Sequence, residues 1–187
     1  MLRNLLGPFG YLKIKHEFKF VVDWIVPLLL TLVSVLLLFL ARKFIKVFDE
    51  NGIVNLIVSF TQILPGFYIA ALAAIATFQR NDIDAEMPEP APSIKIKVQG
   101  KEVKSPLSRR RFLSSMFAFL TAESILIIFV CFFGTSLASF FRSIIPNEFH
   151  WQAIFLYLTL LIFLLWQLVV ATFWGLYYLG DRLHRVS

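Results

Sequence analysis

The residues of this sequence that are best suited to chemistry are polar side chains that interrupt long apolar stretches. Glu123 lies eleven positions after Phe112, where one such stretch begins. At a rise of about 1.5 Å per residue, its carboxyl group would lie roughly 16 Å along a helix, near the middle of a bilayer. An ionised acid costs at least about 2.5–3.5 kcal/mol at that depth. Glu123 is therefore expected to face other helices or water.

Two glutamines accompany Glu123 within apolar stretches. Gln167 lies at a comparable depth in the last stretch, and Gln62 lies somewhat nearer the outer face in the second. One interpretation is a polar centre for ions or protons formed by Glu123, Gln62 and Gln167. The other is that these side chains only hydrogen-bond helices together, at about 0.6–2 kcal/mol per bond. The lack of a basic residue or second acid mid-span favours the second interpretation, because Asp23 is expected near the cytoplasmic interface, within reach of headgroup water.

Recognisable enzyme chemistry is missing from the sequence. The three histidines are far apart, and no HExxH, GxSxG, Walker or GxGxxG pattern occurs. Cys131 is the single cysteine and is interpreted as a small buried hydrophobe. Ser124 cannot use Glu123 as a base, because adjacent positions on a helix do not face each other. We expect a protein that is not an enzyme and that binds no metal or cofactor.

The elements that must position these side chains are four long apolar stretches. Of the 187 residues, 58% are hydrophobic and 16% are charged, whereas soluble domains average about 45–50% and about 25%. A helix needs about 20 mostly apolar residues to cross a bilayer. Pro65-Gly66 predicts a kink in the second stretch. We expect an all-α membrane protein, a four-transmembrane-helix bundle with spans at about residues 20–41, 53–78, 112–139 and 151–179.

Basic residues predict the orientation of these spans. Lys and Arg number four before the first span, eight in the loop 79–111 and two in the tail, against three and one in the other loops. The positive-inside rule then places both ends and the central loop in the cytoplasm of a multi-pass protein, in a plasma membrane such as the bacterial inner membrane. The net charge of +6 is interpreted in the same way, beside anionic lipid, and not as direct nucleic-acid binding. Tyr11 and Lys19 belong to a stretch expected to lie along the membrane surface.

The chain thus divides into three regions. Residues 1–78 hold a cytoplasmic N-terminal segment and the first two spans, residues 79–111 form the central cytoplasmic loop, and residues 112–187 hold the last two spans and a cytoplasmic tail. The first part of the loop is rich in proline, which favours an extended and fairly stiff linker.

The rest of the loop predicts a β-hairpin. Apolar and basic residues alternate with the two-residue period of a strand, and Gln99-Gly100 can form a two-residue turn. That register places Ile96 opposite Val103 and Lys97 opposite Glu102, which are favourable pairs. Because an isolated hairpin is only marginally stable, its apolar face is expected to contact a partner, another copy or the bilayer. The alternative is a solvated, partly ordered linker. The apolar face consists of Ile94, Ile96, Val98 and Val103.

Small residues recur at four-residue spacing on two spans. Such rows let helix backbones approach closely, within one chain or between copies. The row on the second span is Gly66, Ala70 and Ala74, and the row on the third is Ser114, Ala118 and Ala122.

These features favour a non-catalytic membrane component that oligomerises, or that anchors a membrane or cytosolic protein through the loop 79–111. Such a protein could also be an effector whose assembly opens a pore, as in lysis or antiviral defence systems. The alternative is a small ion channel or transporter that uses Glu123, Gln62 and Gln167.

Overall fold

Four helices in the structure, a computed structural model, are long and apolar enough to cross a membrane. The structure describes residues 6–16, 18–77, 93–98 and 101–180. The four expected long apolar helices are therefore found, and they are compatible with a multi-pass membrane protein. The candidate spans are Val21–Leu40, Ile53–Thr77, Arg109–Ser136 and Asn147–Leu179. The elements are η1 (Pro8–Lys13), η2 (Val21–Ile25), α2 (Val26–Leu40), α3 (Ile53–Thr61), α4 (Leu64–Thr77), β1 (Ser93–Val98), β2 (Lys101–Pro106), α6 (Arg109–Ser136), α7 (Ala138–Ile144), η3 (Asn147–Phe149) and α8 (His150–Gly180).

Local sequence explains where two of these helices begin. The second span is broken between α3, which ends at Thr61, and α4, which begins at Leu64. Pro65 thus lies in the first turn of α4, where a missing N–H costs least, and the expected kink is confirmed. Helix α6 begins after Ser108, whose hydroxyl accepts a hydrogen bond from the Arg111 backbone N–H at 3.4 Å.

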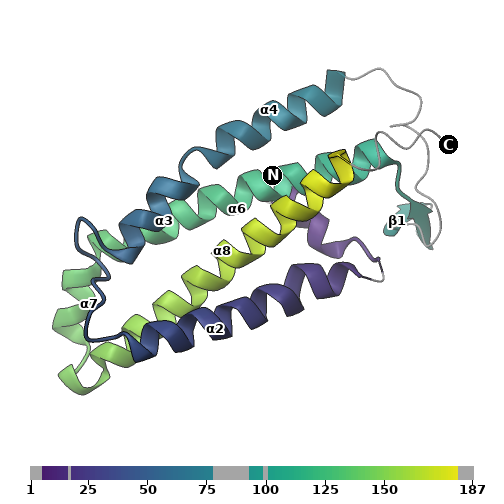
Figure 1. Ribbon diagram of the computed structural model, residues 1–187. Coiled ribbons are helices and arrows are strands. Elements are labelled where there is room, and N and C mark those ends of the chain that lie inside the picture. The colour runs from purple at the N-terminus through teal and green to yellow at the C-terminus, as the bar shows by residue number, and fades with distance from the viewer. Residues whose placement is uncertain (1–5, 17, 78–92, 99–100, 181–187) are drawn as a thin grey trace.

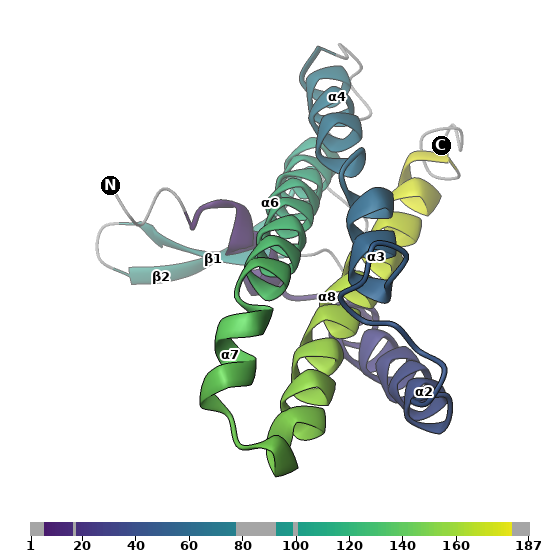
Figure 2. The same cartoon turned by 90° about the vertical axis from the view of Figure 1, so that its left-hand side faces the viewer.

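Helices α6 and α8 form the central pair of the bundle, and α6 is the most enclosed of the four spans. Helix α6 packs against α3, α4, α8 and η1, and α2 packs against α8. Figure 1 shows α8 beside both α2 and α6, and in Figure 2 α2 and α4 project in different directions from the central pair. The bundle is therefore open, with α2 on one side of the central pair and α3 and α4 on the other.

Helices α6 and α8 pack against each other at two glycines, and we call this contact the α6–α8 seam. A Cβ atom on Gly134 of α6 would collide with the hydroxyl of Tyr157 on α8. A Cβ atom on Gly175 of α8 would collide with the terminal methyl of Met116 on α6. At Gly134 the ring of Tyr157 leaves no room for a side chain, whereas at Gly175 the close atom is the flexible end of Met116.

The central loop contains an antiparallel pair of strands. Strand β1 pairs with β2 so that Ile96 lies opposite Val103 and Lys97 opposite Glu102, the register that the alternating sequence predicts. The turn Gln99-Gly100, the Pro-rich linker at 79–92 and the tail after 180 lie outside the described residues. What the apolar face of these strands contacts, and whether the strands are cytoplasmic, stay predictions.

The N-terminal segment is joined to these strands. The backbone N–H of Lys15 donates to the carbonyl of Ser93 at 3.0 Å, and the N–H of Ser93 donates to the carbonyl of Lys15 at 3.1 Å. This two-bond bridge connects the chain ahead of the first span to the first residue of β1. The amino-acid sequence offers no indication of it.

Candidate functional site

A charged pair is buried where the first span begins. Lys19 and Asp23 are one helical turn apart and form an ion pair, although their exposed fractions are only 3% and 2%. Burial lowers the pKa of Lys19, and the negative charge of Asp23 opposes that shift. A buried pair of this kind is costly to desolvate, so it needs further polar partners.

Tyr11 of η1 is one of those partners. Its hydroxyl donates to a carboxylate oxygen of Asp23 at 3.2 Å, and the Lys19 ammonium lies 3.8 Å from the centre of its ring. The other face of the ring stacks on Phe119 of α6, with 5.1 Å between ring centres. Burial, with the negative charge of Asp23 beside it, raises the pKa of Tyr11, which keeps the hydroxyl a donor. The 3₁₀ turn of η1 is thus held against α6 by aromatic contact and against η2 by a hydrogen bond.

Gln167 of α8 joins the same cluster from the opposite side. Its amide nitrogen donates to the backbone carbonyl of Asp23 at 2.8 Å, and the residue is 4% exposed. Asp23 lies in the π-helical turn η2, whose altered backbone spacing accompanies this carbonyl's bond to a side chain. A second polar contact joins α8 to α2, because the Trp166 indole N–H donates to the Ser34 hydroxyl at 2.9 Å.

Glu123 of α6 lies at the centre of the molecule without a hydrogen-bond partner. It is 1% exposed, and neither carboxyl oxygen has a partner within the part of the chain that the structure describes. The carboxyl group is within electrostatic range of Asp23, Tyr11 and Tyr68. An unpaired ionised carboxylate is very costly in such surroundings, so the position is suited to holding a proton. Among the described residues, no three His, Cys, Asp or Glu side chains gather as a metal site would require.

The polar residues singled out from the sequence do not all meet. Glu123 and Gln167 share one buried centre around Asp23, whereas Gln62 is exposed on the outside of the molecule. A centre that includes Gln62 is therefore not formed within one chain.

One expectation about the N-terminal segment is wrong, and another is not tested. Asp23 does not reach headgroup water, because Lys19, Tyr11 and α8 enclose it. Tyr11 and Lys19 are buried against other elements of the protein, and whether the stretch that contains them lies along a membrane surface stays a prediction. The four-residue spacing of Lys19 and Asp23 is the one sequence signal that could have indicated their pairing.

The two rows of small residues have different surroundings. Ser114, Ala118 and Ala122 on α6 are half-buried, whereas Gly66, Ala70 and Ala74 on α4 are exposed. A Cβ atom on Gly66 would meet no described atom within 4 Å. Gln62 lies four residues before Gly66 and is exposed as well. We call Gln62, Gly66, Ala70 and Ala74 the α4 row.

Comparison with known proteins gives no relative from which a function could be transferred. No family model matches the sequence, and no curated protein or solved structure matches it. Function must therefore be inferred from the side chains themselves.

Proposed function

We propose that the protein is a non-catalytic integral membrane component that assembles with further copies of itself through the α4 row. The observation that supports this most directly is that Gln62 and three small residues follow at four-residue intervals in one candidate span and are all exposed. The proposal takes both chain ends and the β1–β2 strands to be cytoplasmic, in a plasma membrane such as the bacterial inner membrane, as the basic residues predict.

The depth of Gln62 is the first argument. It lies nine residues after Ile53, where the span begins, so it is about 14 Å into the membrane at 1.5 Å per residue. An amide that faces hydrocarbon without hydrogen bonds costs several kcal/mol. A glutamine amide carries both donors and an acceptor. Two copies related by a two-fold axis can therefore satisfy each other through the same residue.

The open surface beside Gly66 is the second argument. At Gly134 and Gly175 the facing helix fills the space that the glycine leaves, whereas no described atom lies within 4 Å of a Cβ atom at Gly66. Without side chains in the way, a second helix can approach closely enough for extensive van der Waals contact, which is the main attraction between helices in lipid.

The test is the oligomeric state in lipid bilayers, measured by single-molecule photobleaching over a range of protein densities. Wild type should form dimers or larger assemblies. Gly66→Leu should raise the dissociation constant at least about tenfold, which corresponds to 1.4 kcal/mol. Gln62→Leu should weaken assembly by about 0.6–2 kcal/mol. Leu160→Phe, which adds bulk at an exposed position of α8, is the matched control and should assemble normally. A wild type that stays monomeric at every density would contradict the proposal.

The proposed function has two more specific forms, which differ in what the assembled protein does. As an anchor, it holds a membrane or cytosolic partner through the loop 79–111. As an effector of a lysis or antiviral defence system, it opens a pore and releases a trapped dye from liposomes. The absence of dye release at densities where the protein is assembled would exclude the pore.

A second candidate function, an ion channel or transporter, is favoured by one observation. Both carboxyl oxygens of Glu123 are buried without a hydrogen-bond partner in the described residues, close to Asp23. A carboxyl group in this state can take up and release a proton. In this version Gln167 positions Asp23, and Gln62 belongs to contacts between copies.

A further inference from the structure

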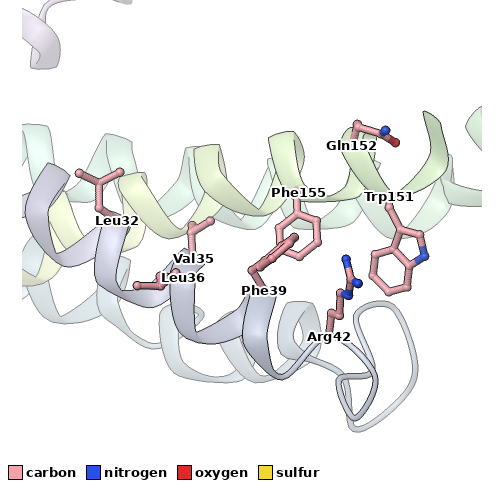
Figure 3. Close-up of a pocket in the computed structure, with 8 residues that line it drawn as sticks. All are labelled: Leu32, Val35, Leu36, Phe39, Arg42, Trp151, Gln152 and Phe155. Atoms are coloured by element: carbon pink, nitrogen blue, oxygen red, sulfur yellow. The ribbon is translucent and has the colours of Figure 1, made fainter. Parts of the chain in front are cut away.

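A groove lies between α2 and α8 at the end of the molecule away from the buried cluster. Its volume is ≈ 560 Å³, within the range of about 300–1,000 Å³ that is typical of ligand sites. Figure 3 shows α2 and α8 side by side along its length. The apolar walls include Leu32, Leu36 and Phe39 of α2 and Phe155 of α8. Leu32 and Leu36 are each 58% exposed, so the groove opens onto the surface that faces lipid.

One end of the groove is polar. Arg42 lies two residues after the end of α2 at Leu40, and Trp151 and Gln152 lie at the start of α8. These positions mark the level at which the two spans leave the hydrocarbon, where Trp is commonly found. Figure 3 shows the Arg42 side chain reaching from α2 toward α8, between the rings of Phe39 and Trp151. Its guanidinium carbon lies 4.9 Å from the centre of the Phe39 ring.

We propose that this groove binds a phospholipid with an anionic headgroup, its phosphate at Arg42 and one acyl chain along Leu32, Leu36 and Phe39. The groove is apolar along its length and cationic at its interfacial end, which is the polarity of such a lipid. A guanidinium is suited to phosphate because it donates two parallel hydrogen bonds. The indole N–H of Trp151 and the amide of Gln152 add neutral donors at the same level.

The position of the groove gives the lipid a structural role. Helix α2 lies at one side of the open bundle and packs against α8. A lipid seated between α2 and α8 contacts both helices, and it thereby adds to the attachment of α2. This role is independent of the proposed self-association, because the groove is formed by α2 and α8 and the α4 row by α3 and α4.

The test uses Trp151 as a reporter of the lipid beside it. The full-length protein is placed in phosphatidylcholine vesicles that contain a small fraction of brominated phosphatidylglycerol or of brominated phosphatidylcholine. Bromine quenches tryptophan fluorescence on contact, and the contribution of Trp151 is obtained by subtracting the signal of Trp151→Phe. Arg42→Gln is the test variant, and Lys43→Gln is the matched control, because Lys43 is equally exposed and does not line the groove.

Brominated phosphatidylglycerol should quench Trp151 with roughly fivefold preference, the ratio that about 1 kcal/mol per basic residue gives at tenfold per 1.4 kcal/mol. The preference should disappear in Arg42→Gln and persist in Lys43→Gln. Equal quenching by the two lipids, or a preference that survives Arg42→Gln, would overturn the proposal. No quenching of Trp151 by either lipid would overturn it as well, because a second copy or another protein would then cover the groove.

Discussion

The α6–α8 seam and the α4 row both place small residues at the surface of a membrane helix, but they differ in what lies against those residues. In the seam, Tyr157 fills the space at Gly134 and Met116 fills the space at Gly175. In the α4 row, the described part of the chain places nothing beside Gly66. The comparison shows that a small-residue pattern identifies a surface for close packing, while only the three-dimensional arrangement shows whether the same chain supplies the partner.

Polar side chains differ between the two regions in the same way. At the start of the first span, Asp23 is enclosed by Lys19, by Tyr11 of η1 and by Gln167 of α8. In the α4 row, Gln62 is exposed within a candidate membrane span. A buried polar group that has its partners stabilises one chain. A polar group that is exposed to lipid is stabilised when a second chain supplies a hydrogen-bond partner.

The largest effect is expected from breaking the buried charge pair on one side only. Lys19→Met leaves the Asp23 carboxylate enclosed without its counter-charge, and this should cost about 3–5 kcal/mol of stability. The measurement is unfolding in mixed micelles with increasing SDS. Lys19→Met combined with Asp23→Asn removes both charges and should recover most of the loss. If the losses of the two single variants simply add in the double variant, the two charges are not coupled.

A smaller effect is expected from adding one methyl group to a glycine of the α6–α8 seam and to a glycine of the α4 row. Gly134→Ala forces the new Cβ against the aromatic ring of Tyr157 and should cost about 1–3 kcal/mol of monomer stability, the usual range for overpacking. Gly66→Ala meets open space and should leave monomer stability unchanged or slightly improved, because alanine favours helix. Thermal unfolding of the two variants in detergent gives the comparison directly. An equal loss at both sites would mean that the surroundings of the two glycines do not differ.

The smallest structural effect is expected at Glu123. Glu123→Gln keeps nearly the same shape, and Glu123 has no hydrogen bond to lose among the described residues, so stability should change by no more than about 0.6 kcal/mol, the average for one side-chain bond in a membrane. If Glu123 carries protons or ions, the same variant should abolish flux in liposomes while assembly persists. Flux that is equal in wild type and variant would remove the transport function, and unchanged flux together with a large loss of stability would make Glu123 purely structural.

The features that follow from local sequence are the ones that could be predicted. The four helices follow from long apolar stretches, and the facing of Ile96 and Val103 follows from a two-residue alternation on both sides of a turn. The kink follows from Pro65. Each of these depends on residues that are close together in the chain.

The features that depend on distant residues could not be predicted. The Tyr11 ring stacks on Phe119, and nothing near Tyr11 in the sequence indicates that partner. In the sequence, Lys19 cannot be distinguished from the other basic residues that set the membrane topology, because its burial also depends on Tyr11. Gln62 and Gln167 also look equivalent in sequence, because depth along a helix is known while the direction of the side chain around it is not.

The hydrogen bond between Gln167 and Asp23 can form only late in the synthesis of the chain. The two residues are 144 positions apart, and a ribosome adds about 5–20 residues per second, so roughly 7–29 s separate their synthesis. During that interval the Asp23 carbonyl lacks its partner on α8. For most of the same time Phe119, on which Tyr11 stacks, has not yet been synthesised. The first span must therefore be held in the membrane by its own apolar residues while its charged beginning is still incomplete. The last helix to be made completes the environment of the first.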